Sequence, residues 1–280
     1  MKLAFHFRAP FTKQMALCEA LKEGAAKLGD AIIAVQGFDG VRDDVDGLVM
    51  LGIGGHSREI FDGYKNAGKR IVFFDKGYTR GGGWYRHAVD AFNPTGYLDK
   101  VTPDPARIPK LVAGVQPYKN GGTHILLDGA SNKFCLWQGL GDWTQWGAKM
   151  VYLLRQHTRH PIIYRPRPSH NPAVPVVGAD LSERPLAEDL ARARVVVSYG
   201  GNIGFDAVVA GRPHFAIGDS IARPLSETDW TRVDRPRLPS RAERCDWLAR
   251  VAACQLRLEE LSEGSGWRAI RKTMDAVRTN

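Results

Sequence analysis

The segment 195–213, VVVSYGGNIGFDAVVAGRP, constrains the fold more than any other part of the chain. It begins with a β-branched apolar run, which is typical of a parallel strand covered on both faces. Two glycines then allow a sharp turn, and apolar residues at helical spacing follow until Gly211 and Pro213 end the helix. A glycine turn that leads from a strand into a helix can bind an anion, because free N–H groups point outward there. A tight turn without a ligand is the alternative.

Length and composition indicate an ordinary globular protein. The chain has 280 residues, of which 44% are apolar and 25% charged, enough for one large or two medium domains. No apolar run is long enough for a transmembrane helix, and the N-terminus reads as a strand, not as a signal peptide. None of the four cysteines has metal-site spacing, so we expect no metal site and reduced thiols. The expected location is the cytoplasm.

The charge is strongly positive, with a formal net charge of +9 and a pI of about 9.5. Arginine dominates the excess, and its planar guanidinium suits bidentate contacts to phosphate. The charge therefore favours a polyanionic partner, either nucleic acid or a phosphate-rich ligand. A purely solubilising role is the alternative.

Strand and helix patterns alternate in both halves and predict an α/β fold with two Rossmann-like, doubly wound domains that face a central cleft. Strands are expected at 2–7, 31–35, 47–52, 70–74, 123–127, 161–164, 195–197 and 214–217, with helices at 13–28, 57–67, 140–156 and 186–191. A further short helix is expected between an N-cap at Asn202 and Gly211. A segment rich in proline and glycine, 100–122, interrupts the alternation, and 241–277 is mainly helical. We expect one domain at 1–120, a second at 121–255 and a C-terminal helix at 256–280 that packs back on the first domain.

In the first half, polar residues follow two expected strands at the edge where ligands bind in such folds. His56 comes after one strand and Asp75 after the next, and either could act as a general base. A histidine that caps its own turn and an ion pair beneath a flexible loop are the alternatives. The residues beyond Asp75 combine cations with aromatic rings, after a triple glycine that suggests a mobile loop. Rings and cations together suit a nucleobase or sugar, so the following are expected to contact such a ligand: Lys76, Tyr78, Arg80, Trp84, Tyr85 and Arg86.

In the second half, three loops after expected strands carry residues suited to phosphate. Prolines hold the segment 165–170, RPRPSH, extended, so Arg165 and Arg167 are expected to project to the same side. Asp206, one helical turn beyond the glycine turn, either accepts ribose hydroxyls or is satisfied by the helix dipole. The complete set of expected ligand contacts in this half is Ser131, Asn132, Lys133, Arg165, Arg167, Ser198, Gly200, Gly201, Asn202 and Asp206.

These segments resemble those of GT-B glycosyltransferases. The block 188–213, EDLARARVVVSYGGNIGFDAVVAGRP, is similar to the donor-site block of capsular-polysaccharide and related transferases, and 165–170 resembles their Lys-Pro-His-Pro segment. The order of these motifs, followed by a helix that ends EGSGW at Trp267, also resembles small bacteriophage glycosyltransferases. The resemblance covers most of 125–270. Asp206 departs from the pattern, because glutamate is commoner at that position and reaches further.

The resemblance implies transfer of a sugar from a nucleotide-sugar donor, with a UDP-sugar as the expected donor, to an acceptor hydroxyl. It makes 1–120 the acceptor-side domain, whose expected ligand contacts named above would be acceptor-binding residues. It makes 121–255 the donor-binding domain, whose expected ligand contacts named above would be donor-binding residues. No cofactor or metal ion is required in this reading. Some phage GT-B enzymes glycosylate hydroxymethylated DNA bases, so double-stranded DNA is the expected acceptor. The alternatives are a sugar-nucleotide epimerase or hydrolase, a transferase that acts on glycans, and a non-catalytic nucleic-acid-binding protein on this scaffold.

Overall fold

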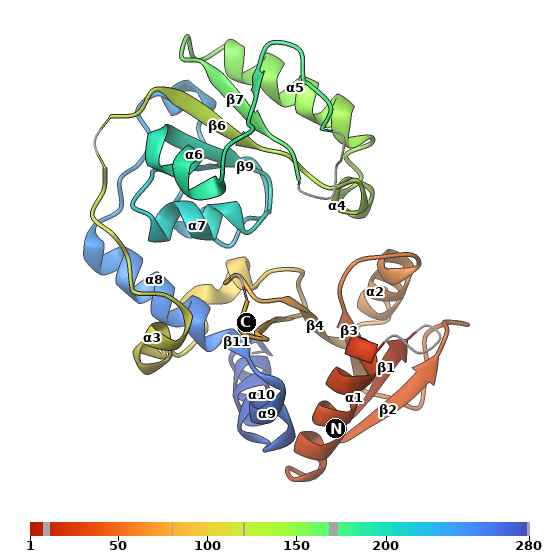
Figure 1. The fold of residues 1–280 in the computed structure, drawn as a ribbon. Helices are drawn as coiled ribbons and strands as arrows, with labels where there is room; N and C mark the ends of the chain where they lie inside the picture. Colours follow the sequence, from red (N-terminus) through yellow and green to blue (C-terminus); the bar gives the residue numbers. More distant parts are fainter. Residues whose placement is uncertain (8–11, 80, 120, 168–172, 279–280) are drawn as a thin grey trace. The chain divides into compact units, whose positions relative to one another are not determined.

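The computed structural model describes residues 1–7, 12–79, 81–119, 121–167 and 173–278. The chain forms two compact units, one of Met1–Arg107 with Ala249–Asn280 and one of Ile108–Leu248, called unit 1 and unit 2 below (Figure 1). Helix α8 (Arg241–Ala253) runs from unit 2 into unit 1. The residues at 108–120 therefore belong to unit 2, although the sequence patterns suggested the first domain. The residues at 249–255 belong to unit 1, although the sequence patterns suggested the second domain.

Unit 1 is built on a six-stranded sheet with the order β11-β5-β4-β3-β1-β2. Its strands are β1 (Lys2–Phe7), β2 (Ala31–Gln36), β3 (Gly47–Leu51), β4 (Arg70–Lys76), β5 (Tyr85–Val89) and β11 (Gln255–Leu256). The first four are parallel, as the alternation of strand and helix patterns predicts. Strand β3 and the middle of β4 (71–74) are apolar, because helices cover both faces of a parallel sheet.

Strands β5 and β11 were not predicted. They add to the edge of the sheet in antiparallel orientation, with β5 on β4 and β11 on β5. Tyr85, expected in a mobile loop, is instead the first residue of β5. Trp84 before it is 7% exposed, and its ring lies against the guanidinium of Arg257, 4.6 Å from the ring centroid. The expectation of exposed aromatic rings is wrong for Trp84, since tertiary packing buries it.

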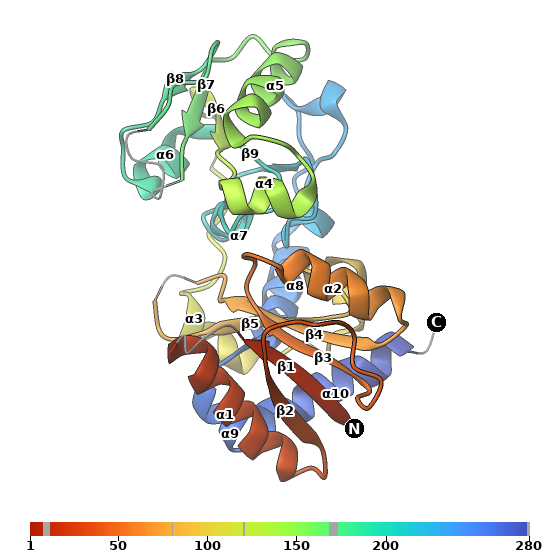
Figure 2. The same ribbon diagram turned by 90° about the vertical axis from the view of Figure 1, so that its right-hand side faces the viewer.

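The helices of unit 1 lie on both faces of its sheet. They are α1 (Thr12–Ala26), α2 (Ser57–Asn66), α9 (Leu258–Ser262) and α10 (Ser265–Arg278), with 3₁₀ turns at Pro94–Lys100 and Pro105–Arg107. Figure 2 shows α2 across the sheet from α1, α9 and α10. Helices α1 and α9 touch so closely that a Cβ on Gly24 would overlap the carbonyl of Leu261. The C-terminal helices are thus part of the unit 1 core.

Unit 2 contains a five-stranded sheet with the order β10-β9-β6-β7-β8, parallel throughout. Its strands are β6 (His124–Asp128), β7 (Ile162–Arg165), β8 (Asp180–Leu181), β9 (Ala193–Ser198) and β10 (His214–Ala216). Its helices are α3 (Ile108–Leu111), α4 (Asn132–Gln138), α5 (Trp143–Arg155), α6 (Leu186–Arg192) and α7 (Ile203–Val209), together with the first part of α8 and 3₁₀ turns at Arg223–Leu225 and Trp230–Arg232. Leu126, Val196 and Ile203 belong to a buried apolar cluster that joins the sheet to α7.

Both sheets reverse their strand order beside their first strand. In unit 1 the chain passes from β1 to β2 and then to β3 on the other side of β1. In unit 2 it passes from β6 to β7 and β8, and then to β9 on the other side of β6. Helical connections leave toward opposite faces at such a point, so a crevice opens at the carboxyl ends of the two strands. Each unit therefore has one place where its topology favours a ligand.

Within the part of the chain that the structure describes, no helix is both long and apolar enough to cross a membrane.

A buried carboxylate ties the C-terminal helix to the sheet of unit 1. Asp30, just before β2, accepts hydrogen bonds from Trp267 Nε1 at 2.9 Å and from Arg271 Nη1 at 2.6 Å. Burial alone would raise the pKa of Asp30, but hydrogen bonds from the amino terminus, Trp267 and Arg271 outweigh it and hold this pKa below its ordinary 3.8. A carboxyl group whose folded pKa is depressed stabilises the fold above its unfolded pKa, and this contribution is lost as the pH falls through the folded value.

Asp30→Asn should therefore lower the free energy of unfolding at pH 7 by about 1–3 kcal/mol, since a buried hydrogen-bonded charge is lost. The variant should also lose less stability than the wild type between pH 5 and pH 3, which urea denaturation at each pH measures. Asp62→Asn is the matched control, because Asp62 forms an exposed pair with Arg58 and should contribute little. Equal effects of the two substitutions would contradict the role of Asp30.

Candidate functional site

At the switch point of unit 2, a charged pair joins the loops that follow β6 and β7. Asp128, the last residue of β6, is buried, and its Oδ2 lies 3.6 Å from Nη2 of Arg167. Arg167 Nε donates to the carbonyl oxygen of Gly129 at 2.9 Å. The Arg167 side chain keeps 31% of its surface exposed, so part of the guanidinium remains accessible. Asp128 was not among the predicted site residues, although its place at the end of a central strand could have indicated it.

The glycine turn after β9 packs directly on this pair. A Cβ on Gly201 would lie 2.5 Å from Arg167 Nη2 and 2.5 Å from Asp128 Oδ2. Only glycine lets the backbone come this close without displacing the pair. The structure thus brings together Asp128, Gly129, Arg167 and Gly201, a cluster that we call the unit 2 site. Such a cluster of cation, carboxylate and close backbone can bind a polar, anionic group.

The residues around this cluster also connect the loops after β6 and β9. Ser131 caps α4, and its side chain accepts a hydrogen bond from the Phe134 amide at 3.2 Å. The Phe134 ring stands edge to face with that of Tyr199, with 5.6 Å between centroids, and lies against Gly200. Asn132 and Lys133 are exposed at the start of the helix. Ser131 therefore serves its own helix, while the two residues after it remain accessible.

Ser198 does not face a ligand. Its Oγ lies 2.9 Å from His214 Nε2, and His214 Nδ1 lies 2.6 Å from Ser226 Oγ, all of them buried. Ser226 donates its one hydroxyl proton to the Ala222 carbonyl, so it accepts from Nδ1–H, and Ser198 donates to Nε2. Burial lowers the pKa of His214 to about 3, which keeps this ring neutral. The Ser198 hydroxyl is therefore used in the core, which leaves only the backbone of Ser198 for a donor contact, and that contact stays a prediction.

Arg165 is also turned inward, away from Arg167. Its Nη1 donates to Asp189 Oδ2 and to the carbonyl oxygen of Arg184, each at 2.6 Å. Asp189 in α6 has no exposed surface and also accepts from the Ser182 hydroxyl. The two arginines were expected to project to the same side, but they reach different partners on opposite sides of β7. Arg165 is needed to compensate a buried carboxylate, which the spacing of the segment does not reveal.

Asn202 and Asp206 lie at the beginning of α7. Asn202 occupies the N-cap position, but its backbone is helical and its side chain makes no capping hydrogen bond. Asp206 lies in the first turn and is partly exposed. The helix has only seven residues, so its dipole is small. The donor roles of both residues stay predictions.

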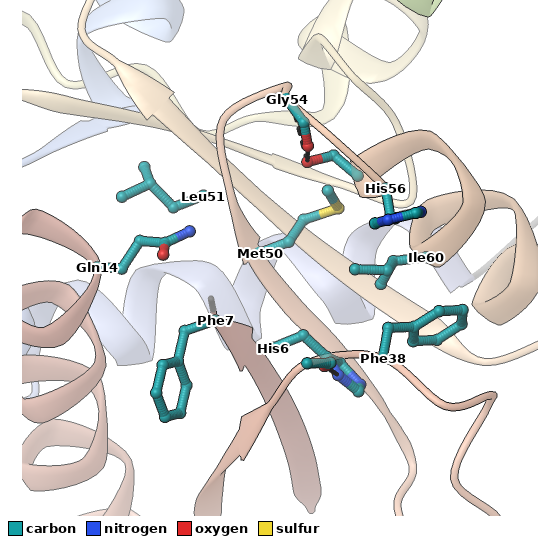
Figure 3. A pocket seen from close by; sticks show the side chains of 11 residues that line it. His6, Phe7, Gln14, Phe38, Met50, Leu51, Gly54, His56 and Ile60 are labelled. Atoms are coloured by element: carbon teal, nitrogen blue, oxygen red, sulfur yellow. Dashed lines mark hydrogen bonds between the residues drawn. The ribbon is translucent and has the colours of Figure 1, made fainter. Parts of the chain in front are cut away.

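The switch point of unit 1 contains a pocket of about 90 Å³ (Figure 3). The carboxyl ends of β1 and β3, the beginning of α2 and Gln14 of α1 form its walls. Most of the lining is apolar, and the side chains that supply it are Phe7, Phe38, Met50, Leu51 and Ile60. The polar lining side chains are His6, Gln14, His56 and Ser57. Such a pocket suits a flat or apolar group with a few polar substituents.

The two histidines of this pocket differ in what they can do. His6 is buried, donates from Nδ1 to the Gly37 carbonyl at 2.8 Å and accepts at Nε2 from the Tyr64 hydroxyl at 2.9 Å. Burial lowers the pKa of His6 and so favours the neutral ring. The His56 side chain is 69% exposed, with Nδ1 3.0 Å from Glu59 Oε2, and it makes no hydrogen bond that caps α2. His56 is therefore accessible to a reactant, whereas both nitrogens of His6 are engaged. His6 was not among the predicted site residues, although a histidine at the end of a first parallel strand is a usable signal.

Asp75 forms the ion pair that the sequence left open as an alternative to catalysis. Its Oδ2 lies 3.2 Å from Arg86 Nη2, and its Oδ1 accepts from the Lys76 amide. Arg86 is 4% exposed, and it also donates to the Phe92 carbonyl and to Asn93. Asp75 thus partly compensates a buried guanidinium.

The predicted acceptor residues divide by burial. Tyr78, Trp84 and Arg86 are buried in unit 1 and offer little surface to an acceptor, so their acceptor contacts stay a prediction without support from burial. Lys76 is exposed and Tyr85 is partly exposed. Arg80 lies outside the described residues. Among the residues described, no group of three or more histidine, cysteine or acidic side chains could hold a metal ion.

Comparisons with known proteins show which solved structures this architecture resembles. No protein-family model and no curated protein sequence matches the chain. Among solved structures, the β-Kdo 2,7-transferase of Thermosulfurimonas dismutans KpsC aligns at 12% identity over 96% of this chain and 99% of that one, with a TM-score of 0.52. The β-Kdo 2,4-transferase of the same KpsC aligns at 11% identity over 88% and 89%, with a TM-score of 0.49. A UDP-GlcNAc 2-epimerase from Neisseria meningitidis aligns at 11% identity over 98% and 99%, with a TM-score of 0.30.

The likeness to the 2,7-transferase shows the fold: the chain is an α/β protein of two Rossmann-like units, similar to GT-B glycosyltransferases. The predicted fold class is confirmed. At this sequence identity the likeness does not extend to substrates.

The burial of Asp189 generates a prediction for unit 2. Arg165→Ala leaves a fully buried carboxylate without its cation, which should cost about 3–5 kcal/mol of unfolding free energy. The double variant Arg165→Met with Asp189→Leu should recover most of this loss, because it removes both charges. Arg167→Ala is the control and should cost much less, since its pair with Asp128 is looser and partly exposed. Urea denaturation of the three variants measures these differences, and equal losses for Arg165→Ala and Arg167→Ala would refute this assignment.

Proposed function

We propose that this protein is a glycosyltransferase that moves a sugar from a nucleotide-sugar donor to an acceptor hydroxyl. The observation that carries this proposal is the set of chemical groups found at the two switch points. The unit 2 site presents a partly exposed guanidinium beside close backbone, and unit 1 has a mostly apolar pocket with an accessible histidine at its rim. A phosphate-binding site and a site for a hydroxyl-bearing group are the two requirements of this reaction.

The donor would bind at the unit 2 site. Arg167 can keep its Nε bond to Gly129 and offer the rest of its guanidinium to a donor phosphate. Asn132, Lys133 and Asp206 surround this site in the proposal, with Asp206 on the ribose. We propose a UDP-sugar as donor, and we assign to Arg167 the stabilisation of the departing diphosphate without a metal ion.

The acceptor would bind in the unit 1 pocket, with His56 as the general base. His56 takes the proton of the acceptor hydroxyl, the freed oxygen forms a bond to the anomeric carbon, and the nucleoside diphosphate leaves with the electrons of the broken bond. His56 is preferred to Asp75 because Asp75 already balances the buried Arg86. Lys76 and Tyr85 remain candidates for acceptor contacts.

The acceptor that we propose is a flat or apolar group with a hydroxyl, because apolar side chains form most of the pocket. A hydroxymethylated DNA base, turned out of its stack, is one such group, and the net charge of +9 favours DNA. Burial of Tyr78, Trp84 and Arg86 weakens the case for DNA, so small aromatic alcohols belong in the same acceptor screen.

The donor class is tested by the thermal stability of the protein with UDP-, GDP-, CMP- and ADP-sugars. One nucleotide sugar should raise the melting temperature, with a UDP-sugar as the expected one. Arg167→Ala should weaken its affinity more than tenfold, which corresponds to about 1.5–3 kcal/mol for a charge-assisted hydrogen bond. Arg165→Met with Asp189→Leu is the matched control and should keep the affinity. Stabilisation by none of these donors would contradict the proposed activity, and turnover to an epimer or free sugar without an acceptor would favour an epimerase or hydrolase.

The general base is tested by His56→Gln and Asp75→Asn. His56→Gln should keep donor affinity and lose about 10²–10⁴-fold in kcat, because glutamine cannot accept the acceptor's proton. Asp75→Asn should keep kcat within a few-fold and lower the melting temperature, since Arg86 loses its carboxylate. Transfer rates of the two variants at saturating donor measure this. Full turnover by His56→Gln together with its loss in Asp75→Asn would move the base to Asp75.

A further inference from the structure

Unit 2 has a second hollow surface at the opposite edge of its sheet, where the parallel strands begin. Two pockets of about 330 and 290 Å³ lie there, and both are lined by Asp234. Their other walls come from the segments just before β7 and β10, from the beginning of β9 and from Tyr118, Lys119 and Gly121. Because they share Asp234, we treat the two pockets as one surface, the amino-edge groove.

The amino-edge groove is lined by five cationic side chains and one acid: Lys119, Arg155, Arg159, Arg194 and Arg235, with Asp234. The histidines 157 and 160 also face it. Asp234 uses one carboxylate oxygen to accept a hydrogen bond from the Thr158 hydroxyl. The positive charge of the groove therefore has little internal compensation.

The bonding of these cations differs from that of two neighbouring arginines, which pair with acids. Arg155 donates to the carbonyl oxygens of His160 and Gly178, and Arg194 donates to that of Asp234. Within the described ranges, neither of them has an acidic side chain as partner, nor do the exposed Lys119, Arg159 and Arg235. By contrast, the nearby Arg232 and Arg237 form ion pairs with Glu227 and Glu243. Unpaired cations in a groove attract a ligand with several negative charges.

Aromatic rings lie in both halves of the groove. Tyr118 lines one pocket and holds the Arg244 guanidinium 4.1 Å from its ring centroid. His157 lines the other pocket, next to the Trp230 ring. Leu238 between the cations is 57% exposed. Rings and exposed apolar surface among arginines suit stacked bases and not an acidic polysaccharide, which has no flat aromatic group to stack.

We propose that the amino-edge groove binds single-stranded nucleic acid, with the arginines on its phosphates and Tyr118 beneath a base. Arginine presents a planar fork that matches phosphate, and stacking on a ring tolerates any sequence. The groove begins at the amino ends of the strands whose carboxyl ends form the unit 2 site. Binding here uses none of the proposed donor residues and goes beyond the proposed transfer reaction.

The test is fluorescence anisotropy with labelled oligothymidine at several salt concentrations. The wild type should bind with an affinity that falls with salt, by about 0.7 in the log–log slope per phosphate contacted. Arg159→Glu with Arg235→Glu should weaken binding more than tenfold and reduce that slope. The matched control is Arg268→Glu with Lys272→Glu, the same change of charge at two exposed positions on α10, and it should change affinity less than threefold. Circular dichroism and the melting temperature show that both pairs of variants fold.

Two further measurements separate backbone contact from stacking and from other polyanions. Tyr118→Ala should weaken oligothymidine binding by roughly tenfold, whereas Tyr118→Phe keeps the ring and should bind like the wild type. Heparin, an acidic polysaccharide without bases, should compete more weakly than unlabelled oligothymidine. Undetectable binding, equal losses in the groove and control pairs, or stronger binding of heparin would each overturn the proposal.

Discussion

The structure depends on one constraint, the right-handed crossover between parallel strands. Because each connection must return along the sheet with the same hand, the chain can add strands on both sides of its first strand only by switching faces. Beside β1 and beside β6 this leaves two neighbouring strand ends with no connection across them. The unit 1 pocket and the unit 2 site both occupy these places, so backbone topology positions them before any side chain is considered.

Once these positions are fixed, buried charged and polar groups determine which polar residues are available. Arg86, Asp189 and His214 are all buried, and each needs a neutralising or hydrogen-bonding partner. Those partners are Asp75, Arg165 and Ser198. Because their side chains are already engaged inside the protein, they are less available to contact a ligand. Arg167 and His56 differ because each pairs with only part of its polar surface and keeps the rest exposed.

The fold was largely predictable because periodicity is a local property. Strands such as 2–7 and 70–76 consist of apolar runs that only a covered parallel sheet explains. The antiparallel strand β11 was not predictable, since it pairs with β5 across a long separation in sequence. Strand β5 pairs with the neighbouring β4, and it was missed because the triple glycine before it suggested a mobile loop. In the candidate sites, the loops were recognised from glycines and prolines, but the direction of Arg165 and the burial of Trp84 depend on partners distant in sequence. Asp128 and His6 were missed because each looks like an ordinary strand residue until its neighbours are known.

The central claim is that the loops after β6 and β9 hold a nucleotide sugar. Amide hydrogen exchange with and without a saturating UDP-sugar tests it most directly, because exchange slows where a ligand holds backbone amides. The account predicts slower exchange at 129–134 and 199–204 and unchanged exchange at the amino-edge groove. Slower exchange confined to the groove, or no change anywhere with a sugar nucleotide that stabilises the protein, would contradict the account.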